Sequence, residues 1–432
     1  MKEKLVIGIQ ERPKSLVQWV VLSLQHVFAM FGATVLVPIL TGLDISVALV
    51  ASGIGTLIYI LCTKGKVPVY LGSSFAYIAA IATAGAATGY DSAYVGLMLV
   101  GIIYVIVATV IRFTGSGWIK FLLPPVVIGP MIMIIGLGLA PVAIGQAGLA
   151  AGSGDSFFAF LATDWHNPVI ALVTFATVLT VALAGKGFFK IVPFLIAVLV
   201  GYITAVLFGV VDLSTVWADA SFFQLPEFAF LGTYSLDFSA IWMFAPIAFV
   251  TIAEHIGDHT VLGEVCDEDF ISDPGLDKTL LGDGIATFVS AAIGGPANTT
   301  YGENTGVVAM TKVGSVYVTG LAAIFAICLG FLGFISAFIA SIPAAVIGGM
   351  TIVLYGLIAG NGVKVLIKSQ IDITNMRNII VIATMLVIGL GGAQIVLSTN
   401  VDGGIVSSLS GMSLAAIVGI VLNLVLPKES LE

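Results

Sequence analysis

The chain has 432 residues, of which 59% are hydrophobic and only 9% are charged, and its mean hydropathy is +1.14. Soluble domains carry roughly 25% charged residues, so this composition excludes a soluble globular protein and indicates an integral membrane protein with several spans. The formal net charge of −8 argues against a nucleic-acid partner. The three cysteines, Cys62, Cys266 and Cys328, form neither a metal-binding spacing nor a disulfide framework.

Apolar segments of about 20 residues, the length that crosses a bilayer, recur along the whole chain. They predict fourteen membrane spans, near residues 17–40, 45–62, 67–86, 93–113, 119–145, 168–184, 188–211, 238–258, 276–294, 298–314, 316–339, 343–366, 378–397 and 408–427. The third and the tenth are irregular, because each mixes polar residues and glycines into a run too short for a comfortable helix.

The basic residues support this number of spans. If the N-terminus lies in the cytosol, all 16 Lys and Arg residues fall on the cytosolic side, as the positive-inside rule requires. Removing one span would break the pattern in the rest of the chain. The sequence therefore predicts a multi-pass protein of the cytoplasmic membrane with both termini in the cytosol.

Three loops are long. The predicted extracellular loops 146–167 and 212–237 are rich in Gly, Ser, Asp and aromatic residues, and we interpret them as solvated connectors rather than as binding elements. The predicted cytosolic loop 259–275 carries a run of acids that begins at Glu264. This run is typical of a solvated segment, with contact to a moving helix as the alternative.

A weak internal repeat relates the two halves of the chain. A Gln-His pair ends at His26 in the first span, and a Glu-His pair ends at His255 in the eighth. His26 precedes Ser74 in the third span by 48 residues, and His255 precedes Glu303 in the tenth span by the same 48. Seven spans per half is an odd number, so the second copy enters the membrane from the opposite side. Inverted repeats with paired interrupted segments indicate a transporter with a site near the bilayer midplane.

The most polar stretch at membrane depth is residues 298–306, Asn-Thr-Thr-Tyr-Gly-Glu-Asn-Thr-Gly. Polar or non-helical backbone inside a bilayer is tolerated only where it is buried in protein or lines a cavity. An acid there indicates a functional site. We therefore predict that 298–306 holds a small polar substrate halfway across the membrane, opposite residues 70–77 of the third span.

Few ionisable side chains lie within the predicted spans. They are His26, Glu254, His255, Asp258, Asp283 and Glu303. Glu254 and Asp258 are four residues apart and so share one helix face. Burying an acid without a partner is costly, which favours a function for Glu254 and Glu303. For His26 and Asp283 a structural role in the core remains an alternative.

The residue types near these acids suit a flat ligand. Carboxylates of Glu254 and Glu303 would accept hydrogen bonds from ring N–H groups, while backbone amides would donate to ring carbonyls. Phe75 and Tyr301 offer flat apolar surface for stacking. This set complements a uracil or oxopurine edge, although packing is the commoner role of any single aromatic residue.

The chain resembles the nucleobase–ascorbate transporter family in several motifs. Asn304-x-Gly306-x4-Thr311-Lys312 is similar to the family signature, and Gln25-His26 is similar to its Gln-His motif. Four stretches resemble its uracil-transporting bacterial members: Leu24–Pro38, Tyr70–Tyr77, Ala253–Gly257 and Asn298–Gly306. The resemblance covers essentially the whole chain.

This resemblance implies an all-α membrane fold of fourteen spans in two inverted seven-span repeats, with short strands in the interrupted spans 3 and 10. Spans 1–4 and 8–11, residues 1–113 and 238–339, would form a substrate-binding core domain. Spans 5–7 and 12–14, residues 114–237 and 340–432, would form a gate domain. Members of this family are commonly homodimers.

The resemblance also implies a proton-coupled uracil importer in which the core moves against the gate. The residues it places around the substrate are Glu254, Glu303, Phe75, Gly302, Tyr301, Ala33 and Tyr355. Those it places in proton coupling are Glu254, His26 and Asp258, with Asn304, Ser74 and His255 in support. Because no His, Cys and Asp residues have the spacing of metal ligands or of a nucleophile and its base, the sequence predicts no cofactor, no metal and no enzymatic activity.

Two positions bear on the choice of substrate. Glu303 precedes Asn304 as in uracil-transporting members, whereas purine-transporting members tend to have Gln there. One turn after Glu254, where the uracil pattern has histidine, this chain has Asp258, as many purine members do, and this leaves the proton route open. A xanthine or urate symporter of the same family is therefore one alternative. An anion transporter on the same scaffold is another, although two glutamates at the site disfavour it.

Overall fold

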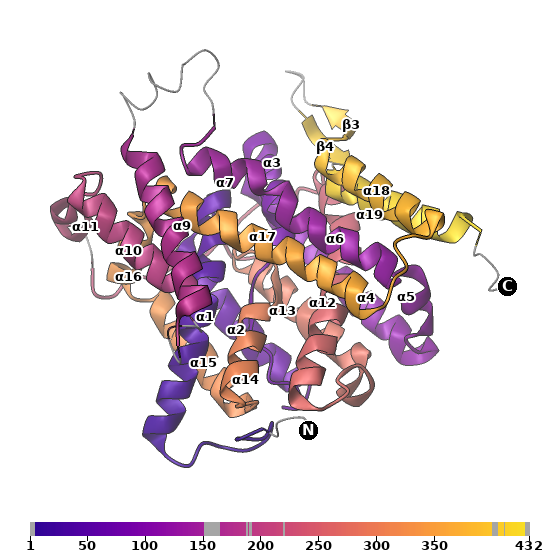
Figure 1. Ribbon diagram of the computed structural model, residues 1–432, viewed down its shortest axis with the longest axis horizontal. Helices are drawn as coiled ribbons and strands as arrows, with labels where there is room; N and C mark the ends of the chain where they lie inside the picture. Colours follow the sequence, from indigo (N-terminus) through magenta and orange to yellow (C-terminus); the bar gives the residue numbers. More distant parts are fainter. Residues whose placement is uncertain are drawn as a thin grey trace.

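The computed structural model describes residues 5–150, 165–186, 189, 192–218, 221–399, 405–409 and 411–427. These residues are mostly helical (Figure 1). In chain order the elements are α1 Leu16–Thr41, α2 Ile45–Cys62, β1 Leu71–Ser73, η1 Phe75–Tyr77, α3 Ile78–Thr88, α4 Tyr90–Thr114, α5 Gly117–Leu122, α6 Pro125–Gly138, α7 Ala140–Gln146, α9 His166–Ala184, α10 Pro193–Leu207, α11 Leu213–Ala218, α12 Ile241–Cys266, η3 Ile271–Gly275, α13 Leu276–Ala292, β2 Asn298–Thr300, α14 Gly302–Thr311, α15 Val316–Gly330, α16 Gly333–Ala340, α17 Ala344–Lys368, α18 Met376–Leu390, β3 Ile395–Thr399, β4 Ile405–Leu409 and α19 Gly411–Val425.

Each predicted apolar segment contains a helix, but several predictions of extent were wrong. The predicted span 378–397 ends as a helix at Leu390 and continues into β3, because Gly391 and Gly392 interrupt it. The segment 316–339 is two helices, α15 and α16, bent by 80°. In the segment 119–145, α5 ends at Leu122, and α6 and α7 together make one span-length helix, Pro125–Gln146.

The loops also differ from expectation. The helix α12 continues eight residues past the predicted end at 258, so Glu264 lies on a helix and not in a loop. The predicted connector 212–237 contains the short helix α11. Most of the predicted loop 146–167 lies outside the described residues.

Length and composition identify the membrane-crossing candidates. Among the described residues, six helices are long and apolar enough to cross a bilayer, or seven if α15 and α16 together make one span. Four shorter apolar helices accompany them: Phe75–Thr88, α10, α18 and α19.

The helices pack in two groups. In one, α13 contacts α4 and α2, and α15 contacts α2 and α1. In the other, α17 contacts α6 and α9, α9 contacts α10, and α18 contacts α19 and α6 (Figure 1). Glycines permit the closest approaches in both. A Cβ atom at Gly101 of α4 would lie 2.6 Å from the Gly284 carbonyl oxygen of α13, and one at Gly129 of α6 would lie 3.1 Å from the Gly362 carbonyl oxygen of α17. Small residues at such crossings are what membrane helices use for close packing.

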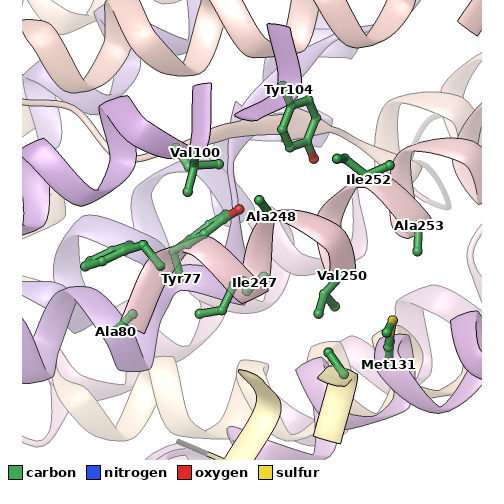
Figure 2. Close-up of a cluster of buried hydrophobic side chains, with 14 of the residues drawn as sticks. Tyr77, Ala80, Val100, Tyr104, Met131, Ile247, Ala248, Val250, Ile252 and Ala253 are labelled. Atoms are coloured by element: carbon green, nitrogen blue, oxygen red, sulfur yellow. The ribbon is translucent and has the colours of Figure 1, made fainter. Parts of the chain in front are cut away.

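A buried hydrophobic cluster joins η1, α4 and α12. Tyr77, Val100, Tyr104, Ile247 and Ala248 lie close together in it (Figure 2). The Tyr77 ring stacks on Phe244 with a centroid distance of 6.3 Å, and its hydroxyl lies 2.9 Å from the Thr251 hydroxyl. This packing fixes η1 against α12, the helix that carries Glu254 and Asp258.

The described residues contain two short pairs of strands, one enclosed by helices and one at the edge of the molecule (Figure 1). β1 and β2 pair antiparallel, with Leu71 opposite Thr300, Gly72 opposite Thr299 and Ser73 opposite Asn298. β3 and β4 form a second antiparallel pair next to α18 and α19 (Figure 1). No strand is expected from the sequence at either segment of this second pair.

Candidate functional site

The β1–β2 ribbon is held by hydrogen bonds to the surrounding helices. The Asn298 side-chain amide donates to the carbonyl oxygens of Ala51 at 3.2 Å and Ala286 at 3.3 Å. The Ser73 hydroxyl donates to the Thr34 carbonyl oxygen at 3.1 Å. All three residues of each strand are buried. The β1–β2 ribbon is therefore enclosed by protein, the setting in which non-helical backbone is tolerated at membrane depth.

A helix begins directly after each strand of the ribbon. η1 and α3 follow β1 from Phe75, and α14 follows β2 from Gly302. Backbone amides in the first turn of a helix have no acceptor within that helix, and the positive end of the helix dipole lies there. Because the strands are antiparallel, these two sets of free amides lie at opposite ends of the ribbon.

A cavity of about 230 Å³ lies against the ribbon. One side is formed by Phe75, the acids of α12 and the start of α14, and the other by α6, α10 and α17. The cavity therefore lies between the two packing groups of helices. Its volume is below the roughly 300–1,000 Å³ of pockets for drug-sized ligands, so it suits a small solute.

Three carboxyl groups line this cavity. Glu254 and Asp258 project from α12, and Glu303 projects from the first turn of α14. The Thr300 hydroxyl donates to Asp258 Oδ2 at 2.6 Å. An acid in the first turn of a helix is favoured by the helix dipole. The arrangement offers several carboxylate oxygens to the N–H groups of a ligand.

Six of the predicted site residues line the cavity. They are Phe75, Glu254, Asp258, Tyr301, Gly302 and Glu303. Tyr301 is fixed in place because its hydroxyl donates to the Ser73 carbonyl oxygen at 3.0 Å and accepts from the Thr34 hydroxyl at 3.2 Å.

The other predicted residues lie behind this lining. Tyr355 is buried and meets Phe75 edge to face at a centroid distance of 6.4 Å. Ala33 belongs to the buried cluster that contains Tyr301. Ser74 is buried, and its backbone N–H donates to the Ala297 carbonyl oxygen at 2.9 Å.

His26 and Asn304 join α1 to α14. The Asn304 side-chain amide donates to His26 Nδ1 at 3.0 Å and to the His26 carbonyl oxygen at 3.1 Å. Both side chains are buried and neither lines the cavity. Their position supports α14, and hence the orientation of Glu303.

Comparison with known proteins identifies the family of this chain. Residues 17–397 match the model of a permease family. The chain is 47% identical over 427 residues to the uracil permease of Bacillus caldolyticus, covering 98% of this chain and 95% of that one. It is 46% identical over 436 residues to the uracil permease of Bacillus subtilis, covering 100% of this chain and 97% of that one. The chain belongs to the nucleobase–ascorbate transporter family.

Solved structures show the same fold in membrane transporters. The transmembrane domain of a cyanobacterial bicarbonate transporter matches with a TM-score of 0.60 and 17% identity, over 96% of this chain and 98% of that one. The murine anion transporter Solute Carrier 26 family member A9 matches with a TM-score of 0.67 and 12% identity, over 96% of this chain and 68% of that one. These structures show a multi-pass membrane fold, and the permease family match with the uracil permease relatives shows a transporter and not an enzyme.

Sequence reasoning missed part of the transporter's cavity wall. Phe194 of α10 and Asn361 and Lys364 of α17 line the cavity, although no motif marks them. The Lys364 ammonium group donates to the Asn361 side-chain oxygen at 3.2 Å. A basic residue one turn from an amide on an apolar helix was the available signal, but Lys364 was interpreted only as a cytosolic charge.

A second buried polar cluster lies on the neighbouring face of α12 in this nucleobase–ascorbate transporter, about 100° round the helix from Glu254 and Asp258. His255 Nδ1 lies 2.7 Å from Asp283 Oδ2 of α13. His259 contacts Tyr59 of α2. His255 was predicted as a supporting residue and Asp283 was left open, whereas His259 was missed because the predicted span ended at residue 258. Its spacing of four residues from His255 would have placed it on the same helix face.

Proposed function

We propose that this protein imports uracil together with protons across the cytoplasmic membrane. One observation carries the proposal: Glu254 and Glu303 line one small cavity with the Phe75 ring at the start of η1. Uracil is planar and presents N–H donors and carbonyl acceptors on its edges, so carboxylates, free backbone amides and an aromatic face are complementary to it. The identity of 46–47% to two uracil permeases over nearly the full chain supports the same substrate.

The orientation of the base follows from the two kinds of polar group. Ring N–H groups would donate to the Glu254 and Glu303 carboxylates. Ring carbonyls would accept from the backbone N–H groups at Phe75 and Gly302, where the helices begin. Phe75 and Tyr301 would limit the site to a flat ligand. Tyr355 and Ala33 would not contact the base but would hold the rings of Phe75 and Tyr301 in position.

The division of the helices supports alternating access. We propose that spans 1–4 and 8–11 form the core and spans 5–7 and 12–14 the gate, because the helices of each set pack mainly on one another and the cavity lies between the sets. The paired breaks at β1 and β2 support two inverted seven-span repeats. The distribution of basic residues supports fourteen spans with both termini in the cytosol.

Proton coupling would use the acids of the cavity. Glu254 and Asp258 share a face of α12 with Thr300 next to them, so a proton taken up there changes the charge that faces the substrate. His26 would act on the same site through Asn304. Co-movement of uracil and this proton as the core passes the gate gives symport. We also propose a homodimer, which the family resemblance supports and which light scattering of the purified transporter tests.

Uptake of radiolabelled uracil by cells lacking their own uracil carriers tests the function. We expect rapid uptake that collapses when a protonophore removes the pH gradient. The variants Glu254→Gln and Glu303→Gln should lose most of this uptake, because each amide replaces a charged acceptor with a neutral group. The variant Glu227→Gln, at an exposed position outside the cavity, is the matched control and should transport normally.

A xanthine or urate symporter is the second candidate, and Asp258 favours it. Excess unlabelled xanthine added to the same assay separates the two substrates. Unlabelled uracil should compete and xanthine should not. Uptake that is blocked by xanthine but not by uracil would replace the uracil proposal with the purine one.

A further inference from the structure

The face of α12 next to the one that carries the cavity acids holds a buried polar cluster. It consists of His255 and His259 of α12, Asp283 of α13 and Tyr59 of α2, and we call it the histidine cluster. All four side chains are 0% exposed. His255 Nδ1 lies 2.7 Å from Asp283 Oδ2, and the two imidazole rings stack with a centroid distance of 3.9 Å.

The partners of His259 determine which ring nitrogen carries the hydrogen when the ring is neutral. His259 Nδ1 lies 2.8 Å from the His255 carbonyl oxygen. A carbonyl oxygen only accepts, so Nδ1 carries a hydrogen. In the neutral ring Nε2 must then accept, and the Tyr59 hydroxyl that contacts it donates. When Nε2 gains a proton, the same hydroxyl can accept instead. The His259–Tyr59 contact is therefore compatible with both charge states.

Two atoms of the cluster lack the partners that a purely structural role requires. His255 Nε2 and Asp283 Oδ1 are buried and have no hydrogen-bond partner among the described residues. Buried polar atoms are nearly always satisfied, and exceptions call for an explanation. A role in proton transfer would explain why His255 Nε2 and Asp283 Oδ1 have no fixed partner.

Stacking limits the charge that the cluster can hold. Two imidazolium rings at 3.9 Å would repel strongly away from water. A proton arriving at the His255–Asp283 pair therefore disfavours one on His259. This makes the histidine cluster a unit that passes on a single proton.

A separate cavity lies beside the histidine cluster, although the His259 side chain itself is fully buried. It has a volume of about 410 Å³, and its lining includes His259 together with Glu264, Asp267 and Glu268. These acids are exposed. Cys266, beside them on α12, lies near Leu5 and Gly314, so the cavity lies on the side of the molecule where the N-terminus lies (Figure 1). An acid-lined opening attracts cations and favours proton exchange with the adjacent solution.

Other titratable groups face α12 from the elements that pack on it. They are Tyr77 of η1, Tyr104 of α4, Glu303 of α14, and Lys368 of α17, which pairs with Glu264. On α12 itself Glu254 and Asp258 immediately precede the two histidines. The histidine cluster thus adjoins the cavity acids on one side and the acid-lined opening on the other.

We propose that the histidine cluster is the proton exit of the transporter, releasing to the cytosol through His259 the proton that the cavity acids take up with the substrate. The proposal rests on the proposed uracil–proton symport. In the release step, His259 Nε2 gives its proton to the Tyr59 oxygen, and Tyr59 gives its own hydroxyl proton to a water molecule. Because Tyr59 is fully buried, this step requires water to enter from the adjoining cavity during transport. The net change is imidazolium and water to imidazole and hydronium. Protons and substrate thereby leave by different openings.

Transport in proteoliposomes tests the exit. Two activities are compared in each variant: accumulation of labelled uracil driven by a pH gradient, and exchange of labelled for unlabelled uracil without a gradient. Exchange needs no net release of protons. His259→Gln should reduce accumulation by about tenfold or more, as expected when a proton-transfer group is removed, and should retain exchange. Tyr59→Phe, which removes only the hydroxyl, should show the same split in a milder form.

The controls separate the possible failures. His166→Gln, a histidine substitution on α9 outside the cluster, should leave both activities intact. A rise in melting temperature on adding uracil shows that a variant is folded and binds uracil. If His259→Gln does not fold, the comparison of accumulation with exchange is made on Tyr59→Phe. Normal accumulation in folded variants would overturn the exit, as would an equal loss of accumulation and exchange. A wild-type protein without uracil exchange would instead overturn the proposed function.

Discussion

The variant Gly72→Ala tests whether the ribbon positions Tyr301. Gly72 lies at the centre of β1, and a Cβ atom there would overlap the Tyr301 ring. The ring cannot move freely, because its hydroxyl bonds both Ser73 and Thr34. One added methyl group therefore forces either the ribbon or the tyrosine out of place.

The expected magnitude follows from these contacts. Overpacking costs about 1–3 kcal/mol and the two hydroxyl bonds contribute about 1 kcal/mol each, so a total loss of roughly 3–5 kcal/mol is expected. If about 1.4 kcal/mol of this loss appears in the free energy of uracil binding, uracil affinity falls tenfold.

Thermal unfolding and uracil binding of the purified variant measure both effects. Gly138→Ala is the matched control, because a Cβ atom there meets nothing within 4 Å. We expect Gly72→Ala to melt several degrees lower and to bind uracil at least tenfold more weakly. Equal melting and equal affinity in the two variants would refute the role of Tyr301 in shaping the site.

Two further predictions concern side-chain bonds. Thr300→Val removes the hydroxyl that donates to Asp258 Oδ2 at 2.6 Å. Because a hydrogen bond to a charged group is worth about 1.5–3 kcal/mol, uracil affinity should fall by tenfold or more in Thr300→Val, whereas Thr300→Ser should stay near wild type. A binding titration in which Thr300→Val keeps its affinity would contradict this. Lys368 of α17 and Glu264 of α12 form a half-exposed ion pair at 2.6 Å. Lys368→Ala should therefore lower the free energy of unfolding by only about 0–1 kcal/mol. A larger loss of thermal stability would contradict the assignment of this pair as a weak surface interaction.

Much of the fold could be predicted because the bilayer imposes strong constraints on sequence. Hydrocarbon requires long apolar segments with internally satisfied backbone, so helices appear where the apolar runs lie. For the same reason the polar runs around Gly72 and Thr299 were informative, since lipid does not accept them. Their pairing as β1 and β2 agrees with the strands expected in the two interrupted spans.

Other features depend on packing that the sequence does not state. The chain near Ile395 reads as apolar and was assigned to a span, yet two glycines after α18 divert it into β3. The helix α12 extends past residue 258 because its last turns remain buried against neighbouring elements, with Leu262 and Cys266 at 6% exposure or less. Hydropathy alone therefore placed the end of this span at residue 258, one residue before His259.

The site was predicted best where residues lie near each other in sequence. Glu254 with Asp258, and Gly302 with Glu303, reach the cavity together because each pair lies on one helix. The opposite wall comes from α10 and α17, which approach only in three dimensions. Phe194 and Lys364 carry no motif, and Tyr355 lies behind Phe75 and not on the cavity surface.

Proton movement that accompanies uracil entry tests the central claim most directly. Proteoliposomes loaded with a pH-sensitive dye and held without a pH gradient receive uracil on one side. Symport through the carboxyl groups of the cavity predicts that the lumen acidifies as uracil enters, and that Glu254→Gln abolishes this acidification. Entry of uracil at the wild-type rate with no change in luminal pH would contradict the account.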